Sequence, residues 1–392
     1  MKRILILLLC VALGACSKRA ALEKQARQGN AKAQAALAYM YATGDGVSRD
    51  EAKAVEWYEK AAERGYARAQ TNLGDLYARG VGVPKDEAKA AAWTQKAAEQ
   101  GDATAQCNLG IMYANGRGVA RDEAKAVEWY EKAAEQDDAK AQFNLGVIHA
   151  TGTGVPKDEA QAVRWYQKAA DQGHAKAQAN LGVMYAQGLG VRQDDAKALE
   201  WNLRAAGHGD ADGQFNLGVI YANGRGVPKD EAKAAEWYEK AALQGDAQAQ
   251  FNLGVFYGSG TGVPKDEAKA FECYQKAAER GYARAQSNLG TMYAQGTVVP
   301  RDDGKALEWN LRAAEQGDAT AQFNVGFMYA NGRGVAPDTI RAYAWLSLAA
   351  VHSVAAAAPA RALLEERLSP EQKAEAQKLF AELIEKAQPR SQ

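Results

Sequence analysis

The chain has 392 residues, with 48 Lys and Arg, 48 Asp and Glu and only 4 His, so its formal charge is zero. This balance argues against a nucleic-acid-binding protein, which needs a basic face to displace counterions from phosphates. A content of 47% hydrophobic residues with only 9 Pro excludes a disordered chain, and the 4 Cys are too few for a scaffold held by many disulfides.

The first residues have the composition of a secretory signal. Lys2 and Arg3 precede the apolar stretch 4–13, which is too short to span a bilayer. Leu13, Gly14, Ala15 and Cys16 then follow in a run that resembles the bacterial lipobox, in which cleavage precedes the cysteine. The resemblance implies a signal peptide at 1–15 and a lipid on Cys16 that anchors the chain to a membrane.

Ser17 follows the lipobox-like cysteine, where an Asp would favour retention in the inner membrane. In bacterial lipoproteins a residue other than Asp favours sorting to the outer membrane, so we expect a periplasm-facing outer-membrane anchor. The alternative is an ordinary secretory signal that contains a cysteine by chance.

From residue 31 the sequence repeats every 36 residues without a gap. The nine copies span 31–66, 67–102, 103–138, 139–174, 175–210, 211–246, 247–282, 283–318 and 319–354. This period predicts a solenoid, in which each unit buries its apolar face by stacking on its neighbours. Residues 16–30 are expected to form the lipidated N-terminus and a capping helix, and residues 355–392 to form C-terminal capping helices.

Each copy begins with the pattern A-x-A-Q-x-N-L-G-x-M-Y-A, whose apolar residues recur at helical spacing. In the third copy these are Ala105, Leu109, Met112 and Tyr113, and Gly110 lies beside them. Glycine inside a helix costs about 1 kcal/mol relative to alanine. Its recurrence in eight copies therefore predicts the close approach of a neighbouring helix.

A loop of the form G-x-G-V-x-x-D follows the first helix. Its first glycine suits a left-handed helix end, its valine is expected to fill the gap between two helices, and its aspartate lies where an N-cap should be. A row of calcium sites is the weaker alternative, since each loop offers only one dependable carboxylate and Ca²⁺ needs six to eight oxygens.

The second helix has the pattern E-A-K-A-x-E-W-Y-x-K-A-A-E-Q-G. Ala54, Trp57 and Ala61 of the first copy are expected to share its packed face. Near the C-terminus, Ser369 and Gln372 form a predicted capping box that starts another helix.

Taken together, the three patterns resemble the Sel1-like repeat, a relative of the tetratricopeptide repeat, over residues 31–354. The resemblance implies an all-α, right-handed superhelical solenoid of helix-turn-helix units with a concave inner face. It also implies a role in binding other proteins as an adaptor in signalling, secretion or host contact.

We find little sign of catalytic or metal chemistry. His149, His174, His208 and His352 are scattered, so no metal site is predicted. The recurrent G-x-G lies between two helices and is a turn rather than a phosphate loop. A cysteine-rich branch of the family has penicillin binding and weak β-lactamase activity attributed to it. Here only Cys107 and Cys273 remain after the anchor region, too far apart in sequence and position to expect a disulfide.

The candidate partner-binding residues lie on the variable face of the first helices, by analogy with the groove of tetratricopeptide proteins. They are Phe143, Phe215, Phe251, Phe323, Phe327, Asn144, Asn216 and Asn252. In the alternative, these Phe pack between successive first helices and the Asn order the loop, and the recurrence of Asn favours this structural account. A partly basic row, interrupted by Asp212, indicates a partner with some acidic character: Lys32, Arg68, Lys140, Lys176 and Arg284.

The sequence thus predicts a non-catalytic scaffold or adaptor, lipid-anchored in the cell envelope, that binds an envelope or host protein on its concave face. We expect no nucleic acid, metal or small-molecule cofactor. Two alternatives stay open: a weak β-lactamase or penicillin-binding protein, and a periplasmic assembly subunit of an export complex.

Overall fold

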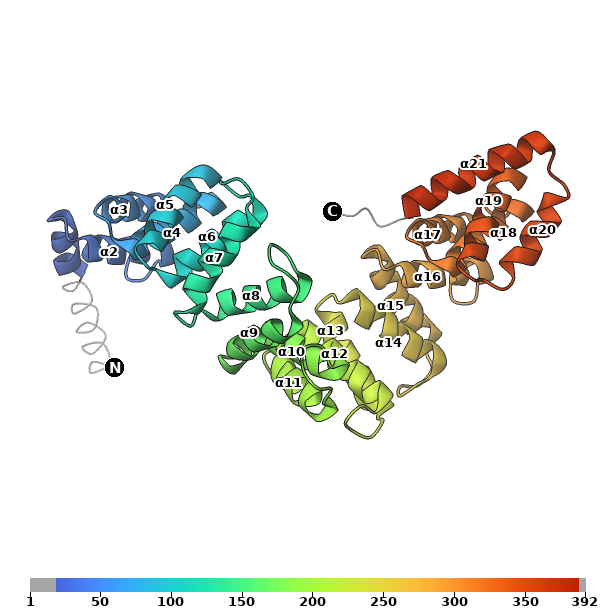
Figure 1. Ribbon diagram of the computed structural model, residues 1–392, viewed down its shortest axis with the longest axis horizontal. Coiled ribbons are helices and arrows are strands. Elements are labelled where there is room, and N and C mark those ends of the chain that lie inside the picture. The colour runs from blue at the N-terminus through green and yellow to red at the C-terminus, as the bar shows by residue number, and fades with distance from the viewer. Residues whose placement is uncertain (1–18, 388–392) are drawn as a thin grey trace, which may run out of the picture. The chain divides into compact units, whose positions relative to one another are not determined.

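The computed structural model describes residues 19–387, and Cys16 with the signal segment lies outside this range. Residues 19–27 are helical, and helices α2 to α21 follow with no strand among the described residues (Figure 1). The chain divides into two compact units at residues 194 and 195, inside the fifth copy. We call them unit 1 (1–194) and unit 2 (195–392).

Each copy forms two helices, and in every copy except the fifth, which is divided between the units, these two helices pack as a hairpin. The first helices of unit 1 are α2 (Ala31–Thr43), α4 (Ala67–Arg79), α6 (Ala103–Asn115), α8 (Ala139–Thr151) and α10 (Ala175–Gln187), and its second helices are α3 (Glu51–Glu63), α5 (Glu87–Glu99), α7 (Glu123–Ala134) and α9 (Glu159–Asp171). The first helices of unit 2 are α12 (Ala211–Asn223), α14 (Ala247–Ser259), α16 (Ala283–Gln295) and α18 (Ala319–Asn331), and its second helices are α11 (Asp195–Gly207), α13 (Glu231–Leu243), α15 (Glu267–Glu279), α17 (Asp303–Glu315) and α19 (Thr339–Val351).

Within each unit the hairpins stack in chain order. A first helix packs on the second helix of its own copy, and that second helix packs on the next first helix. This arrangement confirms the predicted all-α solenoid of repeated hairpins, whose cores are buried only by their neighbours.

The helix-interior glycines confirm the predicted close approach. A Cβ atom added at Gly146 would lie 2.4 Å from Cδ1 of Tyr166, and one at Gly218 would lie 2.5 Å from Cδ1 of Tyr238. Both tyrosines belong to the second helix of the same copy. The absence of a Cβ atom at the glycine therefore allows the tyrosine ring to pack directly against the first helix.

The loops behave as their sequence predicts. Asp122 accepts a hydrogen bond from the backbone N–H of Lys125 at 3.0 Å, and Gly116 ends α6 in the left-handed conformation with φ of 66°. Capping is thus the role shown, rather than calcium binding, and seven equivalent aspartates cap their helices in the same way: Asp50, Asp86, Asp158, Asp230, Asp266, Asp302 and Asp338. Val83 and Val155 are half-buried and pack against the core of their own region.

The packed face of the second helices differs from the prediction. Ala54 and Ala61 have no exposed surface, but the aromatic residue that joins them is Tyr58, which is 3% exposed. Trp57 is half-buried at the edge of that face, where it packs against the neighbouring apolar clusters and Nζ of Lys60 is 4.4 Å from its ring centroid. The spacing i, i+4, i+7 gives Tyr58 the central place, and the i+3 residue Trp57 packs beside it with the lysine over its ring.

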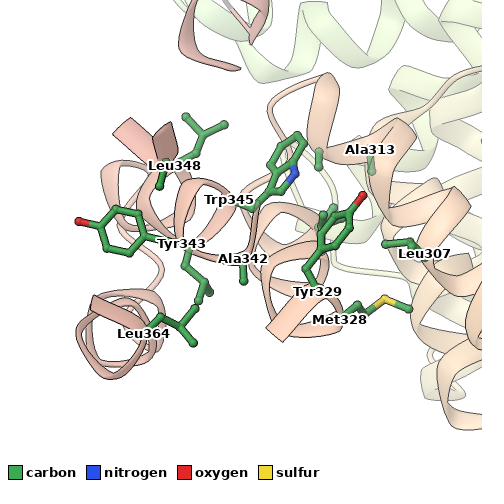
Figure 2. Close-up of a cluster of buried hydrophobic side chains, with 14 of the residues drawn as sticks. Leu307, Ala313, Met328, Tyr329, Ala342, Tyr343, Trp345, Leu348 and Leu364 are labelled. Atoms are coloured by element: carbon green, nitrogen blue, oxygen red, sulfur yellow. The ribbon is translucent and has the colours of Figure 1, made fainter. Parts of the chain in front are cut away.

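The last hairpin is covered by α20 (Ala357–Glu365) and α21 (Pro370–Ala387), both of which contact α19. Leu364 is buried with Tyr343 and Trp345 in one cluster (Figure 2). The backbone N–H of Ser369 donates to Oε1 of Gln372 at 3.0 Å, and that of Gln372 donates to Oγ of Ser369 at 3.3 Å. The predicted capping box is therefore formed.

Candidate protein-binding face of the first helices

The exposed side of each first helix carries the same positions of the repeat, counted from its first Ala. Position 2 is exposed in every copy. Position 9 holds three of the large apolar residues that solvent reaches: Tyr39 is 57% exposed, Val255 39% and Phe327 44%. Positions 3, 4, 7 and 8 face the core. The buried positions therefore hold each first helix in place, and positions 2 and 9 lie on its outer side.

The candidate phenylalanines at position 5 point toward the second helix of their own copy. The Phe143 ring lies 5.9 Å from that of Tyr166 and stacks on His174 at 4.6 Å. Phe215 lies 5.8 Å from Tyr238. Phe251 is only 5% exposed. These contacts lie within one hairpin and at its junction with the next, rather than between successive first helices, and they leave Phe251 almost no surface for a partner.

The candidate asparagines at position 6 bond to the preceding copy. Nδ2 of Asn216 donates to Oδ1 of Asn202 at 2.9 Å, and a hydrogen bond joins Asn252 to the hydroxyl of Tyr238. Asn144 is half-buried at the equivalent place. Each bonded asparagine satisfies a buried polar group of the second helix that lies 14 residues earlier, and this explains why the residue recurs.

A buried glutamine at position 4, which the sequence analysis did not single out, ties adjacent copies together. Nε2 of Gln70 donates to the carbonyl oxygen of Ala62 at 3.0 Å, and Nε2 of Gln100 donates to Oε1 of Gln70 at 2.6 Å. The Oε1 atoms of Gln34 and Gln250 are buried without a partner. In those two copies an arginine stands where the donor glutamine stands in most others.

Hollows open on this face in both units, and one in unit 1, of about 470 Å³, is lined in part by Asp75, Asn108, Ile111 and Lys140. The α2/α4 groove of unit 1 has a volume of about 600 Å³, and its lining includes Lys32, Ala35, Tyr39, Met40, Tyr58, Tyr66, Arg68 and Asn72. The α16/α18 pocket of unit 2 has a volume of about 280 Å³ and is lined in part by Phe323, Asn324 and Phe327. The structure thus brings the candidates Phe323 and Phe327 together, with ring centroids 6.5 Å apart.

The two units differ in the charge of their first helices. Those of unit 1 carry five cations and one anion, a net charge of +4: Lys32, Arg68, Arg79, Lys140, Lys176 and Asp75. Those of unit 2 carry only Arg284 and Asp212, which cancel. Arg79 pairs with Asp75 at 3.1 Å. In the described part of the chain, Lys32, Arg68, Lys140 and Lys176 form no ion pair, so their charges are available to a ligand.

The reactive side chains are dispersed. Between residues 19 and 387, no three His, Cys, Asp or Glu come together in a group that could hold a metal ion. Cys107 and Cys273 are free thiols, and burial raises the pKa of Cys107 to about 12 and that of Cys273 to about 11. In the same range, the helices are too short or too polar to cross a membrane.

Comparisons with known proteins agree with this geometry. The Sel1 repeat family model matches residues 31–66, 67–102, 103–138, 139–174, 175–210, 211–246, 247–282, 283–318 and 319–350. A Sel1 repeat protein from Oxalobacter formigenes is 39% identical, with 76% of this chain and 87% of that chain covered and a TM-score of 0.60.

A protective antigen of uropathogenic Escherichia coli strains with an SLR fold is 37% identical. The match covers 93% of this chain and 86% of that chain, with a TM-score of 0.50. No curated protein matches the chain significantly. The repeat pattern, the hairpins and these matches together show that the chain belongs to the Sel1 repeat family.

Proposed function

We propose that this protein is a non-catalytic scaffold of the bacterial cell envelope that binds a partner protein on the exposed face of its first helices. The supporting observation is the contrast on each first helix between buried positions that fix the frame and two variable positions, of which position 2 is exposed in every copy and position 9 is exposed or half-buried. Sel1 repeat proteins generally mediate protein–protein interactions. A typical interface of roughly 1,200–2,000 Å² would extend over several neighbouring hairpins.

The location of the scaffold is a second part of the proposal. The lipobox-like run that ends at Cys16, followed by Ser17, supports a lipid anchor in the outer membrane with the repeats facing the periplasm. The E. coli relative is described as a protective antigen, which favours an envelope location. Replacing Cys16 with Ala should release the chain from the membrane fraction, and retention there would contradict the anchor.

In-cell photocrosslinking tests the binding face. A photoreactive amino acid at Tyr39 or Phe327 should trap a protein partner, because both side chains are exposed on first helices. The same amino acid at Glu56, exposed on the second helix α3, is the matched control and should trap less. Crosslinks from position 56 with none from 39 or 327 would place the partner elsewhere.

A catalytic role makes a different prediction. Turnover of a chromogenic β-lactam by the purified mature chain, abolished by changing one polar side chain, would contradict a purely scaffolding function. We expect no turnover above that of a heat-unfolded control.

A further inference from the structure

One junction between hairpins occurs twice in the chain with identical sequence. Residues 63–70 and 279–286 both read E-R-G-Y-A-R-A-Q, and a second-helix tyrosine precedes each, Tyr58 and Tyr274. The first copy of this junction lies in unit 1 and the second in unit 2. The contacts of these side chains can therefore be compared between two copies of the same junction that have different neighbours.

In unit 2 a phenylalanine ring fills the space that the junction encloses. Phe251 is 5% exposed, and its ring centroid lies 5.8 Å from that of Tyr274 and 5.2 Å from that of Tyr282. Cζ of Arg284 is 4.9 Å from the ring centroid. Two tyrosines and an arginine thus form a seat for one aromatic side chain.

In unit 1 the same seat has no aromatic side chain of its own. Position 5 is Ala35 instead of phenylalanine, and the counterparts of the seat residues, Tyr58, Tyr66 and Arg68, line the α2/α4 groove. The difference between alanine and phenylalanine leaves room for a ring from another molecule.

Tyr66 adds an independent observation, because it occupies the N-cap of α4 and makes no side-chain cap hydrogen bond. At the same position Asp102 and Asp138 cap α6 and α8 through their carboxylates. A missing cap costs about 1 kcal/mol. In unit 2, Tyr282 also lacks a cap bond but packs on Phe251, whereas no such ring packs on Tyr66 in unit 1 within the described residues.

The charges that line the groove indicate which residues should flank the aromatic side chain of a partner. Lys32 and Arg68 stand at position 2 of adjacent first helices, line the groove and form no ion pair in the described range. The groove is also lined by Asp75, whose carboxylate pairs with Arg79 at 3.1 Å, so the unpaired charge of the lining is positive. Two unpaired cations beside an aromatic seat complement an aromatic residue flanked by carboxylates. Tyr39 is the exposed apolar side chain that would cover the bound segment.

We propose that the α2/α4 groove binds a segment of a partner protein that carries one aromatic side chain between acidic residues. The ring takes the place that Phe251 takes in unit 2, and the carboxylates pair with Lys32 and Arg68. This inference rests on the proposed scaffold function and specifies the chemistry of the partner. An anionic membrane surface would also attract the cations, but it would make no use of the aromatic seat.

The test uses a fluorescein-labelled octapeptide with one Phe among Asp and Glu, titrated into the mature full-length chain by fluorescence anisotropy. Replacing its Phe with Ala, or its acids with Asn and Gln, should each weaken binding at least tenfold. Ala35→Phe, which fills the seat from within as in unit 2, should also weaken binding at least tenfold, and so should Arg68→Glu.

Arg284→Glu is the matched control, because it makes the same charge change in the same junction where Phe251 already fills the seat. It should change the affinity less than twofold. Equal losses with Arg68→Glu and Arg284→Glu, or no loss with Ala35→Phe in a chain whose circular dichroism is unchanged, would overturn the proposal. If Ala35→Phe fails to fold, Lys32→Glu replaces it, with the same tenfold loss expected.

Vesicles of phosphatidylglycerol separate the two sources of negative charge. Vesicle binding that depends on Arg68 but is indifferent to Ala35→Phe, with no peptide binding, would overturn the proposal in favour of a membrane surface. The proposed binding face is tested separately. Crosslinks at Tyr39 without peptide binding would contradict only this inference, whereas crosslinks from the second-helix control alone would contradict partner binding on the first helices.

Discussion

The first helices of the two units share the same buried positions of the repeat but expose different side chains. In unit 1 the face carries a net charge of +4, and Ala35 leaves the α2/α4 groove open. In unit 2 the face is neutral, and Phe251 closes the corresponding seat from within. The tyrosine of the second helix is buried in both units, at 3% exposure for Tyr58 and 9% for Tyr274. Tyr282 and Arg284 pack on a ring in unit 2, whereas their counterparts Tyr66 and Arg68 line an open groove in unit 1, and the size of the side chain at position 5 decides between these roles.

The largest effect should come from emptying the closed seat. Phe251→Ala should lower the free energy of unfolding by about 3–5 kcal/mol, because it removes a buried ring and leaves a cavity. Ala35→Phe in unit 1 should change it by about 1 kcal/mol or less, since the groove has room for the ring. Urea unfolding of the full chain, followed by circular dichroism, measures both, and equal losses would mean that the two seats do not differ.

Replacing the helix-interior glycine of the repeat should destabilise both units by a similar amount. Gly146→Ala and Gly254→Ala should each cost about 1–3 kcal/mol, because the added Cβ would meet a tyrosine ring at 2.4 Å and 2.7 Å. Gly258→Ala is the control in α14, where the nearest atom would be 3.7 Å away, and it should stabilise by about 0.5–1 kcal/mol. Thermal unfolding of the three variants measures their relative stabilities. A loss of stability in Gly258→Ala as large as in the other two variants would contradict this prediction.

A smaller difference in stability is expected between variants of the two tyrosines that make no N-cap hydrogen bond, Tyr66 in unit 1 and Tyr282 in unit 2. Tyr66→Asp and Tyr282→Asp both supply a missing N-cap, a gain of about 1 kcal/mol. Tyr282→Asp also removes the ring that packs on Phe251 at 5.2 Å, so it should be the less stable variant by about 1 kcal/mol. Tyr66→Asp should lose peptide binding although it gains stability from the new cap. Identical urea midpoints for the two variants would argue against an open seat in unit 1.

The smallest effect concerns the two free thiols, one in each unit. Burial raises the pKa of Cys107 to about 12 and that of Cys273 to about 11, so both should react slowly with a disulfide reagent at pH 8, Cys107 more slowly. The folded chain holds these protons to a higher pH than the unfolded chain, whose thiols ionise near 8.5. Their contribution to stability is therefore present below about pH 8.5 and is lost as the pH rises. Faster labelling of Cys107 would contradict its burial.

The recurrent features could be predicted from the sequence because each has a local cause. Gly146 makes space for a ring, and Asp122 caps a helix, wherever the repeat places them. The burial of Phe251 could not be predicted, because it depends on Tyr282 at the end of its own copy and on Arg284 of the next copy. The position of Asn216 in the repeat makes it a candidate partner-binding residue, but its side chain donates to Asn202 at 2.9 Å, a contact that the sequence does not reveal.

Trp57 shows a second limit of pattern reasoning. Trp57 and Tyr58 are adjacent in sequence and both aromatic, and helical spacing allows either to join Ala54 and Ala61. Only the packing against the neighbouring first helix shows that Tyr58 is the buried one, at 3% exposure. The location of the α2/α4 groove likewise depends on how two successive first helices are spaced.

Hydrogen exchange of the full-length chain with and without the acidic Phe octapeptide tests the difference between the two units most directly. We predict slower exchange of backbone amides in α2 and α4 when the peptide is bound, and unchanged exchange in α14 and α16, where the seat is filled. Protection that appears equally in both pairs of helices, or only in α14 and α16, would contradict an open seat confined to unit 1.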